Sequence, residues 1–288
     1  MRKIAAILLF SVCLAGCSDS DDNETPRSFN RILLTEVCNG ASSYNIKRSE
    51  EYRYVGGRMM SRTVSQQFIA PGTEPVESTR VSFAYADDHN SVTLTDEVDT
   101  KRTYSLDADG YATECLYEAY KDRRLYTFSY TNGYLTQLTE KLLPAYGSGE
   151  GALFHTLDLA YSNGSLASIA SSSFRDSPTT PTNQFRTICE AGTDKNVYAF
   201  PCLELLDTYP LTFHHEALFA GMLGKVSQHL IARSYPEQTI GKYSESTAYT
   251  YEFNAQKKPT TIRKRMTYTG GKEQDIYPNQ RDIAITIE

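Results

Sequence analysis

The chain has 288 residues and is acidic, with 35 Asp and Glu against 29 Lys and Arg and a formal net charge of -6. Nucleic-acid binding depends on a basic surface that neutralises phosphates, so this charge argues against nucleic acid as a partner. The length is sufficient for one large core, and β proteins of this size are often a single domain.

Residues 1–17 are predicted to be a lipoprotein signal peptide. Arg2 and Lys3 give a positive start, and residues 4–12 form an apolar run too short for a permanent membrane helix. The following Leu14-Ala15-Gly16-Cys17 resembles the lipobox of bacterial lipoproteins, in which the cysteine is diacylated and becomes the first mature residue. Lipidation at Cys17 would anchor the protein to a membrane. The alternative is an ordinary cleaved secretory signal with a stray cysteine.

Residues 18–29 are expected to form a flexible tether. They begin with the acidic run Ser18-Asp19-Ser20-Asp21-Asp22, which is solvated and self-repelling, so the segment has a reach on the order of 20 Å. An acidic run directly behind a lipidated cysteine also resembles the export signal of Bacteroidetes lipoproteins for the outer leaflet of the outer membrane. The resemblance implies a lipid-anchored, surface-exposed protein; the alternative is that any polar linker would serve here.

The clearest structural pattern is a β-hairpin over residues 124–142. Tyr126, Phe128 and Tyr130 alternate with smaller or polar residues, which indicates a strand with one buried face. Asn132-Gly133 then supplies the two positive-φ positions of a type I′ turn. The same order of residues recurs over 157–169 around Asn163-Gly164.

Ten strands are predicted in succession, separated by short turns, which implies antiparallel neighbours. A sheet of that length curls or closes because strand twist accumulates. We therefore expect an all-β fold, an antiparallel meander that curls into a soluble barrel or half-barrel. Charged residues lie between the aromatic ones, so the aromatic face should point inward and not into lipid. The predicted strands are 48–54, 58–68, 79–85, 91–95, 101–106, 112–120, 124–130, 134–142, 156–161 and 165–173.

The meander is interrupted over residues 174–246, where the hairpin pattern is lost. This irregular insertion is expected to contain one short helix over residues 214–222, ended by glycines. An excursion of this length inside a barrel is typical of a plug or a recognition surface. Strand character returns over residues 230–233 and 246–253 and ends over residues 282–287, so residues 30–288 are assigned to one barrel-like domain.

The repeated aromatic-x-Tyr-x-Asn-Gly-x-Leu units, residues 219–225 and the final Tyr249-x-Tyr251-x-Phe253 segment resemble a Bacteroidetes lipoprotein family of unknown function with a porin-like fold. The hairpins also distantly resemble the YD repeats of Rhs-type shells. The resemblance covers almost the whole mature chain. It implies a barrel and an envelope location, and it brings no catalytic residues.

Candidate site residues are few. Cys189 and Cys202 lie in one irregular segment and are a possible disulfide, although four mature cysteines allow three pairings. Tyr111 and Tyr134, beside predicted turns, are possible binding residues. The sequence contains neither the spacing of a metal site nor a serine nucleophile elbow, so we expect no cofactor, no metal and no catalytic residue.

The sequence therefore favours a non-enzymatic binding module for a glycan or an envelope protein. Two alternatives stay open. A glycan-active hydrolase would need a pair of carboxylates that the fold brings together, which spacing in a sequence does not reveal. An envelope structural protein would need a large surface for contacts between subunits.

Overall fold

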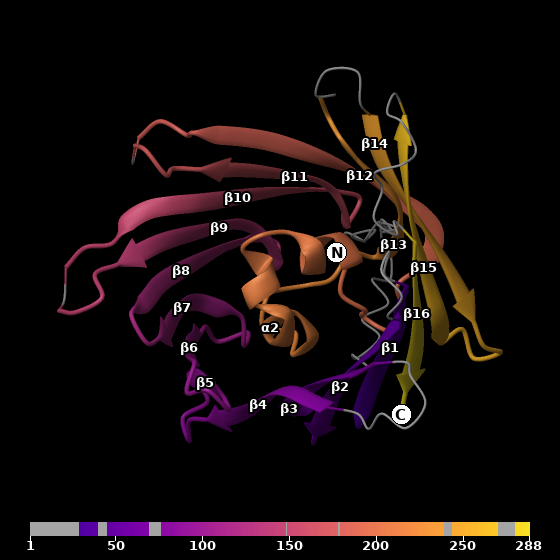
Figure 1. Ribbon diagram of the computed structural model, residues 1–288, viewed down its shortest axis with the longest axis horizontal. Coiled ribbons are helices and arrows are strands. Elements are labelled where there is room, and N and C mark those ends of the chain that lie inside the picture. Colours follow the sequence, from indigo (N-terminus) through magenta and orange to yellow (C-terminus); the bar gives the residue numbers. More distant parts are fainter. Residues whose placement is uncertain are drawn as a thin grey trace, which may run out of the picture.

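The computed structural model describes residues 29–39, 45–68, 76–147, 149–177, 179–238, 244–269 and 280–288. These residues form sixteen antiparallel strands that close into one barrel, in which β1 pairs with both β2 and β16. The chain runs around the wall almost in sequence order, and Figure 1 shows the strands as a ring around a helical centre. The predicted all-β barrel is confirmed, and it is closed.

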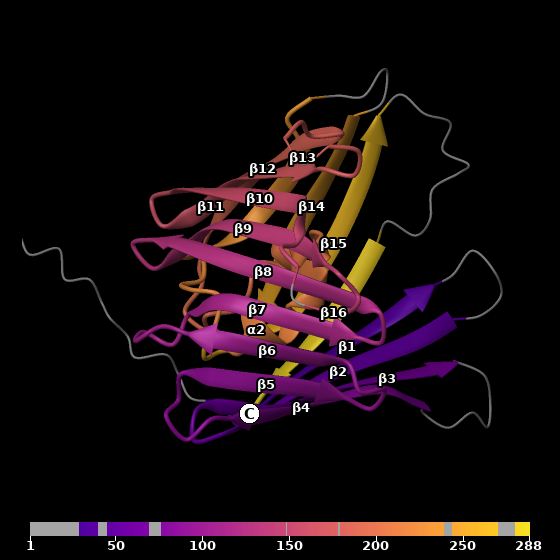
Figure 2. The same ribbon diagram turned by 90° about the vertical axis from the view of Figure 1, so that its left-hand side faces the viewer.

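The strands are β1 (Arg31–Asn39), β2 (Asn45–Val55), β3 (Arg58–Phe68), β4 (Val76–Tyr85), β5 (Ser91–Asp96), β6 (Lys101–Leu106), β7 (Ala112–Ala119), β8 (Asp122–Thr131), β9 (Tyr134–Leu143), β10 (Ala152–Ser162), β11 (Ser165–Ser173), β12 (Asn183–Lys195), β13 (His229–Pro236), β14 (Ser244–Phe253), β15 (Pro259–Thr269) and β16 (Gln280–Ile287). Three short helices follow β12: α1 (Leu203–Asp207), the 3₁₀ helix η1 (Leu211–Phe213) and α2 (His215–Phe219). Figure 2 shows β5 to β11 side by side across one flank of the barrel.

The two ends of the barrel differ, and we name them by their residues. The base is the end at which the described chain begins and finishes, because Asn30 donates a backbone hydrogen bond to Glu288. The turns at Gly56-Gly57, Asn132-Gly133 and Asn163-Gly164 also lie at the base, since β2, β8 and β10 all run toward it. The rim is the opposite end, where β5, β7, β9 and β11 finish.

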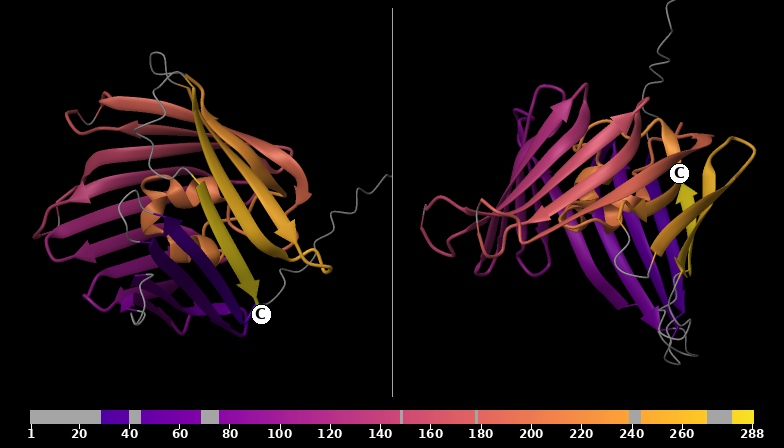
Figure 3. Two further views of the ribbon diagram at one scale, coloured as in Figure 1. Left: turned by 45° about the vertical axis from the view of Figure 1, so that its right-hand side comes forward. Right: turned by 90° about the horizontal axis from the view of Figure 1, so that it is seen from above.

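Residues 196–228, which connect β12 to β13 along the chain, form a plug that fills the barrel. Figure 3 shows its helices enclosed by the strands. The insertion was predicted over residues 174–246, but β12 lies inside that range. So does β13, which confirms the strand character predicted over residues 230–233. The prediction missed β12 because its sequence, NQFRTICEAGTDK, does not alternate and its side chains are mostly exposed. The predicted short helix is confirmed as α2.

Inward-facing side chains of the wall are mainly apolar, whereas outward-facing side chains are mainly polar. Buried residues of the strands are largely aromatic and aliphatic, including the fully buried Tyr52, Tyr104 and Tyr126. A transmembrane barrel instead places an apolar band on its outer face. The polar outer face agrees with the predicted inward orientation of the aromatic side chains. Outward positions include Thr93, Thr95, Lys101, Thr103, Thr127, Thr139, Lys141, Asp158, Glu252 and Arg263.

Within the described ranges, no helix is long and apolar enough to span a bilayer.

Candidate functional site at the rim

The plug is fastened to the base through hairpin turns. Lys225 N–H donates to the Gly133 carbonyl at 2.7 Å, and Gln228 N–H donates to the Gly164 carbonyl at 2.9 Å. Both predicted Asn-Gly turns have positive φ at both residues, as a type I′ turn requires. A side chain at Gly224 would place a Cβ 2.6 Å from the Gly133 oxygen, so this approach depends on glycine.

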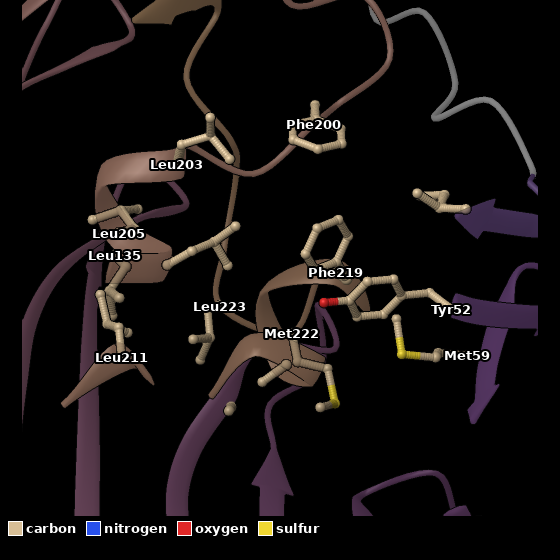
Figure 4. Packing of buried hydrophobic residues seen from close by; sticks show 14 of the residues in the cluster. Tyr52, Met59, Leu135, Phe200, Leu203, Leu205, Leu211, Phe219, Met222 and Leu223 are labelled. Atoms are coloured by element: carbon tan, nitrogen blue, oxygen red, sulfur yellow. The ribbon is translucent and has the colours of Figure 1, made fainter. Parts of the chain in front are cut away.

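Apolar contacts complete the seal at the base. The Phe219 ring stacks on Tyr52 with their centroids 4.0 Å apart, and it meets Phe200 edge to face. The Tyr54 hydroxyl donates to the Phe219 carbonyl at 3.0 Å. Figure 4 shows this cluster between the plug and the wall. Residues 219–225, part of the family resemblance, are thus the segment that closes the base.

Polar contacts hold the other side of the plug. Glu216, which is 1% exposed, accepts from Arg62 at 3.0 Å and from Arg102 at 2.7 Å. Burial alone would raise the pKa of Glu216, but the two guanidiniums overcome that effect and lower it to about 2. The carboxylate is therefore charged at neutral pH and serves as an anchor for the plug.

Two acidic residues of α1 also bind side chains of the wall. Glu204 accepts from Ser234 Oγ at 2.7 Å and from the Tyr249 hydroxyl at 2.6 Å. Asp207 accepts from Lys264 Nζ at 2.7 Å and pairs with Arg281 at 3.2 Å. Together with Glu216 these contacts reach three separate parts of the wall, so the plug is held on several sides.

A group of aromatic side chains faces the rim side of the plug. Tyr117, Tyr209 and Phe213 are half-buried, and Phe213 meets both tyrosines edge to face. Arg124 lies 5.1 Å from the Phe213 ring and 5.9 Å from Tyr117. Its guanidinium is oriented by a two-pronged ion pair with Asp122, whose side chain is 42% exposed. We call these five residues the aromatic floor.

Exposed apolar side chains lie at the rim, in three successive hairpin turns and near the start of β12. Val98 lies between β5 and β6, Tyr120 between β7 and β8, and Tyr146 between β9 and β10; Phe185 lies at the start of β12. Their exposed fractions are 81%, 93%, 77% and 57% respectively. Since neighbouring strands lie about 4.8 Å apart, successive tips are roughly 10 Å apart along the rim. This row, the aromatic rim, follows one continuous arc of the barrel end.

The binding residues proposed from sequence lie at the base. Tyr111 stacks on Tyr130 at 5.3 Å, and Tyr134 packs on Tyr161 at 4.7 Å with Lys225 over its ring. Both are half-buried, and Tyr134 also bridges to Gly224 of the plug. Sequence reasoning missed Tyr120 because it was placed within a strand; in the structure it occupies a tight turn with φ of 47°.

The cysteines are not joined in this structure. Cys189 and Cys202 are free thiols, with Cys189 buried and Cys202 partly buried. Burial raises the pKa of Cys202 to about 12, so this thiol is unreactive as it stands. Cys17 lies outside the described residues. Across the described residues, no group of His, Cys, Asp and Glu has the arrangement of a metal site.

Comparison with known proteins places this barrel in a family. Residues 53–261 match the family described as "Domain of unknown function (DUF4595) with porin-like fold". The chain belongs to this family. The expectation of a porin-like family of unknown function is thus confirmed. No curated protein matched the chain.

Two solved structures of similar fold come from Bacteroides. A porin-like protein from Bacteroides uniformis is 27% identical, with a TM-score of 0.75 over 90% of this chain and 98% of that one. A porin-like protein from Bacteroides vulgatus is 9% identical, with a TM-score of 0.52 over 91% of this chain and 98% of that one, and shows the fold alone.

Proposed function

We propose that this DUF4595 protein is a lipid-anchored lipoprotein of the outer membrane that binds a glycan or protein partner at the cell surface through its aromatic rim. One observation carries the proposal. The described chain begins at the base, at Phe29, while the exposed rings lie at the rim, the opposite end of the barrel. A tether from Cys17 would therefore hold the base toward the membrane and leave the rim facing away from it.

The chemistry of the rim suits recognition. Large exposed apolar side chains on a polar surface are typical of binding sites. Tyrosine combines a ring face for packing with a hydroxyl for hydrogen bonding, which suits both sugars and peptide chains. Beneath the rim, Arg124 and Asp122 offer a cation and an anion that are partly exposed and already oriented. A partner that packs on the rings can thus also exchange polar contacts with the floor.

The geometry gives little support to the alternative of a glycan-active hydrolase. Glu50 and Glu216 both bind Arg62, which makes them the clearest carboxylate pair inside the barrel. A glycosidase needs one carboxyl that keeps its proton near neutral pH. Burial would raise the pKa of Glu50, but Arg62 and Arg48 lower it to about 2, as Arg102 and Arg62 do for Glu216. Neither group can act as the general acid.

The orientation can be tested with matched cysteines. Val98→Cys lies at the rim and Val55→Cys at the base, and both native side chains are well exposed. On intact cells, a membrane-impermeant maleimide should label Val98→Cys strongly, and Cys17→Ala should release the protein from the membrane fraction. Labelling of both cysteines only after lysis would place the protein inside the outer membrane and overturn surface display.

A further inference from the structure

A serine and a histidine on neighbouring strands form a hydrogen bond that neither holds the plug nor belongs to the rim. Ser171 Oγ on β11 lies 2.9 Å from His155 Nε2 on β10, within the range of a nucleophile and its general base. The register of β10 against β9 shifts between Leu153 and His155, so His155 directly follows a bulge. Bulges of this kind often re-aim a side chain next to an active site.

A carboxylate stands on the other side of the histidine. Glu140 on β9 is the direct cross-strand partner of His155, and both side chains face the interior. Glu140 Oε1 accepts from Arg124 at 2.7 Å and from the Tyr209 hydroxyl at 3.0 Å. Its second oxygen, Oε2, has no hydrogen-bond partner in the described structure, and neither has His155 Nδ1.

These two unpaired atoms are chemically complementary. If the Ser171 hydroxyl donates to Nε2, the histidine carries its proton on Nδ1, which needs an acceptor. Glu140 Oε2 is a free acceptor on the facing residue. Glu140 is 0% exposed and His155 is 5% exposed, and buried polar atoms without partners are rare in folded proteins. Burial also lowers the pKa of His155 to about 4, so the ring is neutral at pH 7.

We propose that Ser171 and His155 form a nucleophile–base pair for small carboxylic esters, and that Glu140 completes a Ser–His–Glu array when its free Oε2 accepts the Nδ1 proton of His155. The Ser171 proton moves to His155 Nε2 as Oγ bonds to the acyl carbon, and the alcohol leaves with that proton. Water then cleaves the acyl-serine by the reverse transfer, which releases the acid and restores the hydroxyl. Glu140 is a positioning residue that stabilises the charged ring.

One side chain of the plug packs on His155. The Tyr209 ring meets the His155 ring edge to face at 5.1 Å and is itself half-buried in the aromatic floor. Ser171 is 1% exposed, and its cross-strand partner on β12 is the exposed Phe185. A short acyl group therefore has to pass Tyr209, and removal of this ring should open the array.

The test uses the full chain with p-nitrophenyl acetate and a fluorophosphonate probe, followed by peptide mapping. Ser171→Ala is the test variant, and Ser173→Ala, the next inward serine of β11, is the matched control. Label should map to Ser171 and be lost only in Ser171→Ala, and Tyr209→Ala should accelerate both reactions. His155→Gln should slow ester hydrolysis about 100-fold, as expected for loss of a general base.

Circular dichroism checks that each variant keeps its strand content. If Ser171 takes up no probe in the native protein or in Tyr209→Ala, the proposal is overturned. It is equally overturned if Ser171→Ala hydrolyses the ester as fast as Ser173→Ala. Neither result bears on partner binding at the aromatic rim.

Discussion

The base and the rim of this barrel use tyrosine in opposite ways. At the base, the Tyr54 hydroxyl donates to a carbonyl of the plug, and the Tyr130 hydroxyl donates to carbonyls of β7 and of the plug. Both rings pack beneath the plug. At the rim, Tyr120 and Tyr146 are 93% and 77% exposed. The difference follows from the plug, which enters and closes only one end. A tyrosine beside a turn is therefore a structural residue at the base and a candidate contact residue at the rim.

The largest effect should come from breaking the ionic anchor of the plug. Glu216→Ala leaves Arg62 and Arg102 as buried cations without their shared partner, so the free energy of unfolding should fall by about 3 to 5 kcal/mol. The measurement is urea denaturation followed by circular dichroism. Glu252→Ala is the control, since its ion pair with Arg263 is exposed on the outer wall and should contribute less than about 1 kcal/mol. Equal losses would contradict the anchoring role.

A smaller stabilisation is expected if Cys189 and Cys202 become oxidised. The predicted disulfide would link β12 to the start of α1 and close a short loop, adding about 3 kcal/mol to stability. Alkylation of the unfolded protein under non-reducing conditions, followed by mass spectrometry, shows whether these two thiols are blocked. Blocked Cys115 instead would contradict this pairing.

Acid should weaken the plug in two stages. Burial lowers the pKa of His214 to about 3 and that of His155 to about 4, from 6.5, so unfolding takes up protons and stability falls as the pH drops from about 6.5 to 3. Glu50 and Glu216 have folded pKa values of about 2 against 4.5, so their contribution is lost from about pH 4.5 to 2. Unfolding free energies measured from pH 7 to 3 should show both declines. A flat profile between pH 6.5 and 5 would contradict the buried neutral histidines.

The smallest effect on stability should come from the rim. Tyr120→Ala and Tyr146→Ala remove exposed rings and should change the free energy of unfolding by less than about 0.5 kcal/mol. Tyr54→Phe at the base removes a buried hydrogen bond to Phe219 and should lose about 1 kcal/mol. Thermal denaturation of the three variants side by side makes this comparison. A larger loss at the rim than at the base would contradict the division between the two ends.

Local pattern predicted most of the wall. The hairpin of β8 and β9 follows from the alternation of Tyr126 and Phe128 with polar residues and from the Asn132-Gly133 turn, and the structure has both strands there. The first strand, β1, and β12 were missed. β12 could not be identified because its own sequence has no strand pattern. Its position is determined by pairing with β11 and β13.

The contacts of the plug could not be predicted, because they join residues far apart in the chain. Glu216 binds Arg62 and Arg102, which are 154 and 114 positions away. Such long-range partners leave no spacing signal in one sequence. The same holds for the rim, since the exposure of Tyr120 and Tyr146 depends on which barrel end the plug fills. Tyr111 and Tyr134 had equally good local signals and lie at the closed end.

The most direct test of the central claim is a glycan-array screen of the chain from Ser28 to Glu288, with Tyr120→Ala and Tyr146→Ala as rim variants and Tyr134→Ala as the base control. A pull-down from outer-membrane extract with the same variants covers protein partners. The account predicts that a bound partner is lost with the two rim variants and kept with Tyr134→Ala. Binding that persists in both rim variants and disappears with Tyr134→Ala would place the site at the base and contradict the account.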